Sequence, residues 1–591
     1  MGETLQSLIL TKYPTPIFAA SELLFSSLSL GPSPTFIPLV LLLATLRLHG
    51  LRIAFRSTRV PELMCSWLVV TIGAAMAHYS SATNALSSPT MSFVAVGVMS
   101  AITYVCAIFA FYMDICFSRR LPTIWAQITF FPVVWAMTWS AISHISPVGR
   151  LLNWSPVSTS HPYGWLLPYT GPAGIDFAVA ACAALCTEAA AIWLMGSNGE
   201  EQLVTSTSSV DQVSSKRRSR NLLTVGILLA ALALPSLHVS LPLRIDTAFD
   251  VSPLGVACAL PPLRKGSHPV LSDFIAETRK LTSLAKVVLW PESAVVFHSQ
   301  EEREDAFELL RKDIQQSLIG VAFEEFVLED PSDPSGSRMK RNGLALVNHE
   351  QKRGDEIVQY YKRNLVPFTE SFSAVPSAEP PSIYTLELGP PKWTTKPEWS
   401  STPNHTRPIA ITSSICLDLA FSSAFSSLDS RPALILAPAR TWDSTVGLAM
   451  WEQAKSRANE IGSMVLWCDG GATGVSGVGG GGISEIMQVG AGSWTRTIGL
   501  QFPFDQQRTL YAIIGETGVF VFLVAIMVVG SVASYLPALP GYAFSYLPVL
   551  PGRHAFLGIV SALRRLIPGR RADQANLIDF TESGERQSLL G

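Results

Sequence analysis

The sequence predicts two kinds of structure in one chain: an α-helical membrane bundle of about seven plus one transmembrane helices, and an inserted α/β layered domain. Long apolar segments fill residues 1–241 and return at 516–535, whereas residues 242–515 carry a normal globular mixture. A mean hydropathy of +0.31 and a length of 591 residues exclude a single soluble domain. We therefore expect a bundle at 1–241, an extracytoplasmic domain at 242–515, a closing helix at 516–535, and a cytosolic interfacial segment with a polar tail at 536–591.

The apolar segments are expected to be the helices of the bundle. They lie near 5–30, 34–47, 64–79, 91–113, 124–143, 173–195, 222–241 and 516–535. A membrane span needs about 17–25 apolar residues, so the second and third segments are short. Prolines interrupt the first segment, for which a cleaved signal peptide is an alternative.

Charges in the loops predict the orientation. Basic residues gather in alternate loops, at 47–59, 119–120, 216–220 and 553–571, while the intervening loops have almost none. By the positive-inside rule both termini lie in the cytosol and residues 242–515 lie on the other side. The formal net charge of −2 argues against a nucleic-acid partner, since such proteins usually carry a basic excess.

Two glycosylation sequons fall on the predicted far side, at Asn153 and Asn404, and predict a glycoprotein. With the polar tail, they favour a eukaryotic secretory-pathway or vacuolar membrane. Cys258, Cys416 and Cys468 are the cysteines of the globular part, and their odd number and spacing suggest neither a metal site nor a required disulfide.

Short apolar runs alternate with helical patterns in residues 242–515, which is typical of an α/β layered domain. The expected strands are 287–290, 320–323, 344–347, 409–415, 433–439 and 464–469, and the expected helices are 269–285, 301–318 and 447–461. The span 371–407 is expected to be a long loop. The glycine-rich run 470–482 is expected to be a flexible turn, and it lacks the Lys-Ser/Thr of a phosphate-binding loop.

Three short contexts place reactive side chains at or near strand ends. VVLWPES carries Glu292, QYYKRNLVPFTES carries Lys362 and Glu370, and ITSSICLDLAF carries Cys416. A carboxylate, an ammonium and a thiol together can activate a nucleophile and stabilise an oxyanion. Each residue alone has an ordinary explanation: a buried structural cysteine, a solvated turn glutamate or a surface lysine. Their combination favours an acyl-transfer centre.

These motifs resemble those of the nitrilase (carbon–nitrogen hydrolase) superfamily, and within it the apolipoprotein N-acyltransferases. The resemblance covers nearly the whole length and implies a four-layer αββα sandwich with Glu292, Lys362 and Cys416 as the catalytic residues and Glu370 as a second essential glutamate. TWDS (441–444), KSRANEIG (455–462) and CDGGATGV (468–475) resemble further family segments, and Trp442 and Asp418 are supporting candidates. Leu417-Asp418 replaces the usual Tyr-Glu after the nucleophile, and the first strand lacks the usual Gln-x-Asn, so the substrate is left open.

The resemblance implies an enzyme that moves an acyl chain from a membrane phospholipid to an amine through a cysteine thioester, with no cofactor and no metal. A membrane-anchored amidase acting on a lumenal amide is the alternative, and a non-catalytic scaffold is a third possibility. The residues alone do not separate transfer from hydrolysis.

Overall fold

Each long apolar segment contains a helix in the computed structural model. The model describes residues 12–54, 59–83, 85, 88–158, 161–195, 209–238, 241–245, 250–262, 268–313, 317–328, 338–355, 357–367, 369–391, 394 and 396–535. Residues 1–531 form one unit and residues 532–591 a second. The expected interfacial segment and tail at 536–591 lie outside the described residues.

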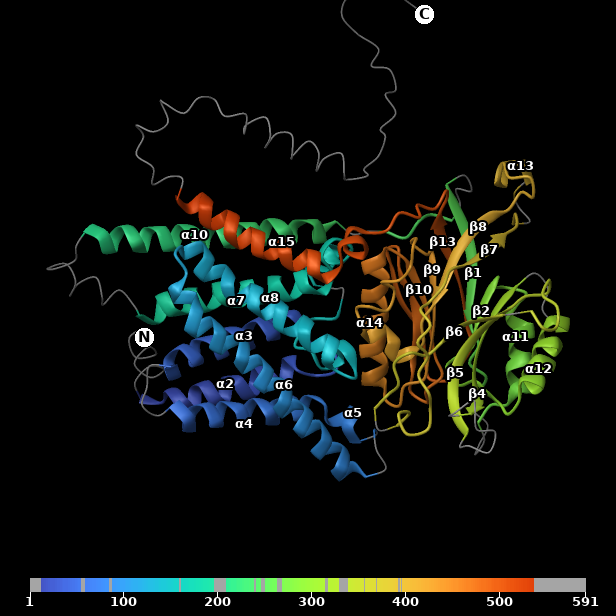
Figure 1. Cartoon of the computed structure of the whole chain (residues 1–591), viewed down its shortest axis with the longest axis horizontal. Coiled ribbons are helices and arrows are strands. Elements are labelled where there is room, and N and C mark those ends of the chain that lie inside the picture. Colours follow the sequence, from blue (N-terminus) through green and yellow to red (C-terminus); the bar gives the residue numbers. More distant parts are fainter. Residues whose placement is uncertain are drawn as a thin grey trace, which may run out of the picture. The chain divides into compact units, whose positions relative to one another are not determined.

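The helices of the bundle follow the expected order along the chain (Figure 1). They are α2 (Pro14–Ser29), α3 (Phe36–Ala54), α4 (Arg59–Ala77), α5 (Tyr79–Thr83), α6 (Pro89–Phe117), α7 (Ile124–Ile145), α8 (Leu167–Met195), α10 (Ser209–Ala233) and α15 (Leu510–Tyr535). Within the described residues, seven helices are long and apolar enough to cross a membrane. The first expected span, α2, has 16 residues and is not one of them. Short one-turn helices η2 (Ser118–Arg120), η3 (Gly149–Leu152), η4 (Gly164–Leu166) and η5 (Leu234–Leu237) connect them.

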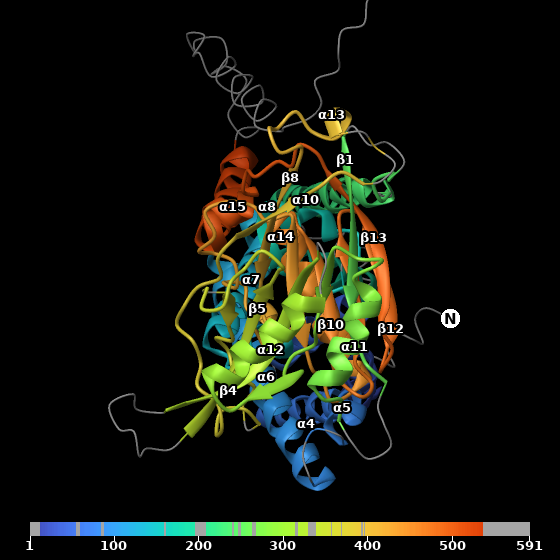
Figure 2. The same cartoon turned by 90° about the vertical axis from the view of Figure 1, so that its right-hand side faces the viewer.

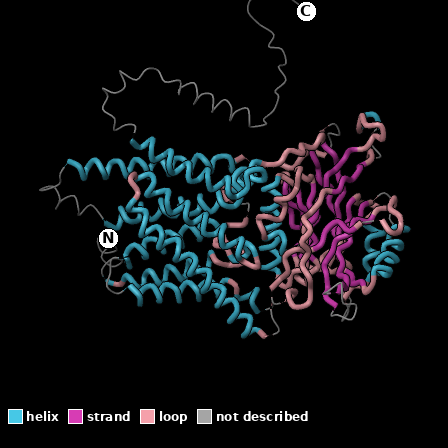
Figure 3. Tube along the Cα trace, viewed as in Figure 1, coloured by secondary structure: helices cyan, strands magenta, loops and turns pink. Residues whose placement is uncertain are grey.

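The strands gather apart from the long helices (Figure 3) and form two mixed sheets. In the first sheet, the strand order is β13-β1-β2-β4-β5-β6, with β3 paired to β4. Its strands are β1 (Val251–Cys258), β2 (Val287–Leu289), β3 (Val295–Phe297), β4 (Leu318–Leu328), β5 (Arg338–Val347), β6 (Val358–Tyr361) and β13 (Trp494–Gln501). In the second sheet, the order is β12-β11-β10-β9-β8-β7. Its strands are β7 (Tyr384–Leu388), β8 (Arg407–Ser413), β9 (Leu434–Ala439), β10 (Met464–Asp469), β11 (Val475–Gly480) and β12 (Ile483–Val489).

Helices cover the outer faces of the two sheets. The amphipathic helices α11 (Leu271–Leu281) and α12 (Gln300–Asp313) lie side by side over the first sheet and bury Phe274 and Phe307 against it (Figure 2). α14 (Ser444–Ile461) packs on β10 and β11 of the second sheet and also on α8 of the bundle. The largest apolar cluster lies between the sheets and includes Leu289, Leu436 and Leu466. Because both sheets are covered on two faces, interior strands such as β2 (VVL) and β9 (LILAPA) are apolar throughout.

Two local expectations are wrong. The span 371–407 contains β7, which pairs antiparallel with β8, and the one-turn helix α13 (Lys396–Trp399). The glycine run contains β11, which pairs antiparallel with β10. Its glycines serve packing, because a Cβ on Gly479 would lie 3.0 Å from the Trp451 ring and 2.6 Å from Lys455 Cγ of α14. A strand without side chains on that face lacks the β-rich pattern that predicts strands.

A disulfide also corrects the sequence analysis. Cys258, at the end of β1, is bonded to Cys468 of β10, and both residues are fully buried. β1 belongs to the first sheet and β10 to the second, so the bond joins the two sheets. Only Cys416 among the three cysteines of this domain keeps a free thiol. The odd cysteine number therefore reflects one disulfide and one free thiol.

Candidate active site

Glu292 lies just beyond β2, in a turn that reaches across to the second sheet. Its backbone N–H donates to the carbonyl of Ala439 at the end of β9, with a distance of 3.3 Å. The next residue, Ser293, has a φ of 54°, which is uncommon for a residue with a side chain. The Glu292 side chain is 4% exposed, and Asn342 Nδ2 donates to its Oε1 at 3.3 Å. The turn therefore presents a buried carboxylate between the sheets.

Lys362 directly follows β6 and is 1% exposed. Its Nζ lies 2.7 Å from Glu292 Oε1, and 2.8 and 2.7 Å from the two carboxylate oxygens of Glu370. Glu370 also accepts a hydrogen bond from the backbone N–H of Val366 at 2.8 Å, which closes the loop that carries both residues. The ammonium is thus fixed between two carboxylates and has little rotational freedom.

Cys416 begins the one-turn helix η6 (Cys416–Ala420) just after β8. Its φ is 44°, in the left-handed region that residues with side chains seldom adopt. Such strain persists only where the surroundings impose it, and it is common at functional sites. The thiol is buried and hydrogen-bonds to Glu292, and the backbone of Arg440 makes a further hydrogen bond to the sulfur. Residues from β2, β6 and β8 therefore meet at one point.

The electrostatics of this centre favour a neutral thiol at rest. Burial and the Glu292 charge raise the pKa of Cys416 well above its usual value, although the Lys362 ammonium opposes them. Burial also raises the pKa of Glu292, against the attraction of Lys362. The pKa of Lys362 is raised because the charges of Glu292, Cys416 and Glu370 outweigh its desolvation. Lys362 thus stays charged, and Glu292 is the carboxylate that hydrogen-bonds to the thiol.

Asp418 lies in η6, two residues beyond Cys416. Its side chain is fully buried and accepts hydrogen bonds from the Tyr360 hydroxyl at 2.7 Å and from the Asn364 backbone N–H at 2.7 Å. The Asn364 side chain donates as well, at 2.8 Å. Burial raises the pKa of Asp418, and these donors act in the opposite direction. Asp418 therefore links the Cys416 turn to the Lys362 segment.

The other predicted residues lie elsewhere. Trp442 is 45% exposed and its Nε1 donates to the Ser81 carbonyl of α5 at 3.1 Å, so it joins the domain to the bundle and does not touch the centre. Asn404 is exposed on the loop before β8. Asn153 is 2% exposed, and its Nδ2, the atom that would carry a glycan, donates to the Trp139 carbonyl at 3.0 Å. Burial and this hydrogen bond argue against a glycan on Asn153, and glycosylation of Asn404 stays a prediction.

Sequence reasoning missed two buried polar residues, Asn342 and Asp469. Asn342 lies inside β5, where nothing in the pattern marks it as a Glu292 partner. Asp469 ends β10, fully buried, and accepts hydrogen bonds from the Thr441 backbone at 2.9 Å, the Thr441 hydroxyl at 2.6 Å and the Gly471 backbone at 2.9 Å. An aspartate at the end of a buried apolar strand was a usable signal, because a buried carboxylate requires partners.

Comparison with known proteins gives a distant structural likeness. No family model matches the chain, and no curated protein matches it. Similar solved structures include Nit3 of Saccharomyces cerevisiae, a member of branch 10 of the nitrilase superfamily, with 17% identity over 43% of this chain and 92% of that chain and a TM-score of 0.30. Another is the C. elegans NitFhit protein, with 16% identity over 47% of this chain and 65% of that chain and a TM-score of 0.27. The structural neighbours are thus nitrilase-superfamily members at low identity and partial coverage.

Proposed function

We propose that this chain is a membrane-bound acyltransferase of the apolipoprotein N-acyltransferase type, in the nitrilase superfamily, and that it moves an acyl chain from phospholipid to an amine. The observation that carries the proposal is the meeting of Glu292, Lys362 and Cys416, with the Lys362 ammonium held 2.7 Å from Glu292. The motifs around these residues resemble that family, and the chain offers helices long and apolar enough to hold the site near lipid.

In the first half-reaction, Glu292 takes the thiol proton as the Cys416 sulfur attacks the ester carbonyl of a phospholipid. A carbon–sulfur bond forms, and the Lys362 ammonium stabilises the oxyanion of the tetrahedral intermediate. When the intermediate collapses, the ester carbon–oxygen bond breaks, and Glu292 returns the proton to the departing lysophospholipid. A raised pKa suits this exchange, because it makes the Glu292 carboxylate a better acceptor for the thiol proton.

In the second half-reaction, an amine attacks the thioester. A carbon–nitrogen bond forms, the carbon–sulfur bond breaks, and Glu292 carries a proton from the amine to the sulfur. Glu370 keeps the ammonium in place through both steps, since it contacts Lys362 with both carboxylate oxygens. If an amide replaces the phospholipid as acyl donor and water replaces the amine as acceptor, the same centre acts as an amidase.

The proposed location is lumenal or extracytoplasmic for residues 242–515. Besides the distribution of basic loops, the Cys258–Cys468 disulfide supports it, because disulfides persist mainly in oxidising compartments.

The test is the mass of the Cys416 peptide after the purified chain is incubated in phospholipid vesicles. We expect an acyl adduct that disappears when an amine acceptor is added, together with loss of transfer by several orders of magnitude in Cys416→Ser. Cys186→Ser, which alters an exposed free cysteine of α8, is the matched control and should keep full activity. Turnover retained in Cys416→Ser would exclude the thioester. An adduct formed only from amides would indicate an amidase. Absence of any turnover or adduct would indicate a non-catalytic scaffold.

A further inference from the structure

The nucleophile turn rests against a turn of the helical bundle. η3, between α7 and α8, packs on η6, which begins with Cys416. At the contact, Gly149 has a φ of +57°, and a Cβ built there would lie 2.6 Å from the Ala420 carbonyl oxygen and 3.2 Å from Phe421 Cδ2. The Gly149 backbone therefore packs directly against the backbone of Ala420, the last residue of η6. Only glycine permits so close an approach at this φ.

The next two residues fix this contact from opposite sides. Leu151 packs on the apolar cluster between the sheets, to which Cys416 and Leu419 belong. Arg150 points back into the bundle: it is 4% exposed, and its Nη2 lies 2.8 Å from Asp176 of α8 and 3.0 Å from Ser155 Oγ. Arg150 and Leu151, which are neighbours in η3, thus point in opposite directions. Together they join the core of the bundle to the core of the domain.

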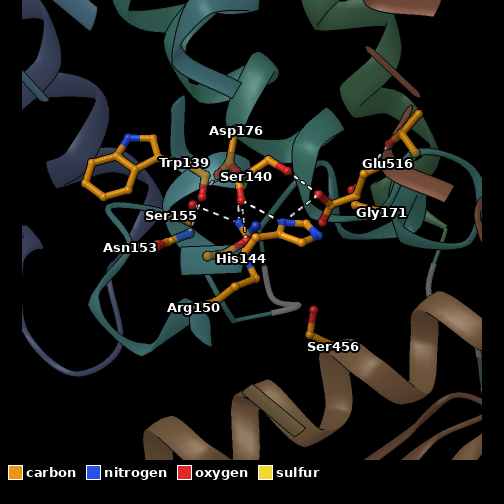
Figure 4. A network of polar contacts seen from close by, with 12 residues as sticks. Trp139, Ser140, His144, Arg150, Asn153, Ser155, Gly171, Asp176, Ser456 and Glu516 are labelled. Atoms are coloured by element: carbon orange, nitrogen blue, oxygen red, sulfur yellow. Dashed lines mark hydrogen bonds and ion pairs between the residues drawn. The ribbon is translucent and has the colours of Figure 1, made fainter. Parts of the chain in front are cut away.

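The bundle side of this contact is a buried polar network (Figure 4). Ser155 donates to Asp176, which is fully buried, and Asn153 Nδ2 donates to the Trp139 carbonyl of α7. Removing one partner of a buried ion pair leaves the other charge unpaired and is strongly destabilising. The network therefore holds η3 rigidly on α7 and α8.

We infer that η3 of the bundle is a positioning element for the Cys416 nucleophile. It supports the end of η6 while Asp418 holds the middle of η6 against the Lys362 segment, so the sulfur is fixed from two independent sides. The Arg150–Asp176 pair transmits the rigidity of the bundle to the domain. The bundle then contributes to the geometry of the centre as well as to its place at the membrane. The inference rests on the proposed function only in treating Cys416 as the nucleophile.

The test uses Gly149→Ala and the pH profile of Cys416 alkylation, read as the mass of the Cys416 peptide. The new methyl group must displace the Ala420 carbonyl, so we expect a profile that departs from the wild type and a kcat for acyl transfer lowered by about 10²-fold, as misplacement of reacting groups by about 1 Å can cause. Gly354→Ala is the matched control. Its φ is +92° but a Cβ there meets nothing within 4 Å, so it carries backbone strain without the contact.

If Gly149→Ala does not fold, Leu151→Ala is the test variant. The Leu151 substitution removes packing and introduces no clash. Leu152→Ala, a half-buried neighbour outside the apolar cluster, is its control. We expect a smaller departure of the profile in Leu151→Ala and none in Leu152→Ala. A wild-type alkylation profile in the folded Gly149 or Leu151 variant overturns the inference, whatever happens to kcat. An altered profile in a chain whose wild type transfers no acyl group supports the inference and refutes the proposed function.

Discussion

Asp418 lies two residues beyond Cys416, Asn364 lies two residues beyond Lys362, and two hydrogen bonds join Asp418 to Asn364. The Asp418 Oδ1 accepts hydrogen bonds from the Asn364 backbone N–H at 2.7 Å and from the Asn364 side chain at 2.8 Å. Since β6 and β8 belong to different sheets, this pair links the segment that carries the ammonium to the segment that carries the sulfur. Two loops that share no sheet hydrogen bonds are thereby held in register.

We predict that Asp418→Asn lowers kcat by about 10²-fold and destabilises the fold by about 1–3 kcal/mol. An amide nitrogen facing these donors leaves at least one of them unsatisfied. The measurements are acyl-transfer kinetics and thermal unfolding. Asp418→Glu keeps the acceptor and should recover part of kcat. Tyr360→Phe removes a single donor and should have a smaller effect. Equal kcat in Asp418→Asn and wild type would show that this link does not position the centre.

A second prediction concerns the Lys362 charge. Lys362→Met keeps the apolar stem but leaves Glu292 and Glu370 facing each other without a cation, so the pKa of the Cys416 thiol should rise further. Loss of the oxyanion cation should lower turnover by at least about 10²–10³. The midpoint of Cys416 alkylation against pH reports the thiol. Lys340→Met, at a partly exposed lysine paired with Glu324, is the control. An unchanged midpoint in Lys362→Met would remove Lys362 from the centre.

Some features of the fold and of the site could be predicted from the sequence, and others could not. Glu292 and Cys416 could be proposed from local context, because each stands just beyond a predicted apolar strand, whereas Lys362 could be proposed from the motif that it shares with Glu370. The Asp418–Asn364 pair could not, since it depends on how two sheets face each other. The Cys258–Cys468 bond joins residues 210 positions apart, and sequence does not define such pairings. The strand β11 was not predicted, because α14 packs so closely on Gly479 that no side chain fits there and the usual strand pattern is lost.

A third prediction concerns pH and Glu460 of α14, a buried carboxyl paired with Arg457. Burial raises its pKa from 4.5 to about 7, against the attraction of Arg457. A raised folded-state pKa contributes stability that is fully present below pH 4.5 and is lost as pH rises through 7. The loss corresponds to about 3 kcal/mol of unfolding free energy.

Unfolding midpoints measured between pH 4.5 and 8 test this. Glu460→Gln cannot ionise, so it should match the wild type near pH 4.5 and exceed it at pH 8. Glu379→Gln, at an exposed position, should leave the pH dependence as it is. If wild type and Glu460→Gln lose stability in parallel over this range, another group is responsible.

The last prediction concerns topology. If residues 242–515 face the lumen of a glycosylating cell, the chain should carry one N-glycan, on the exposed Asn404, and none on Asn153, whose Nδ2 is bonded inside the bundle. The measurement is gel mobility with and without glycosidase. Asn404→Gln should abolish the whole shift, and since its side chain is exposed, the fold should tolerate the change. A tag at the C-terminus should be digested by protease added to sealed microsomes, because that end is predicted to be cytosolic. A protected tag together with an unglycosylated Asn404 would invert the orientation and place the Cys416 centre in the cytosol, where the Cys258–Cys468 disulfide would have no oxidising environment to maintain it.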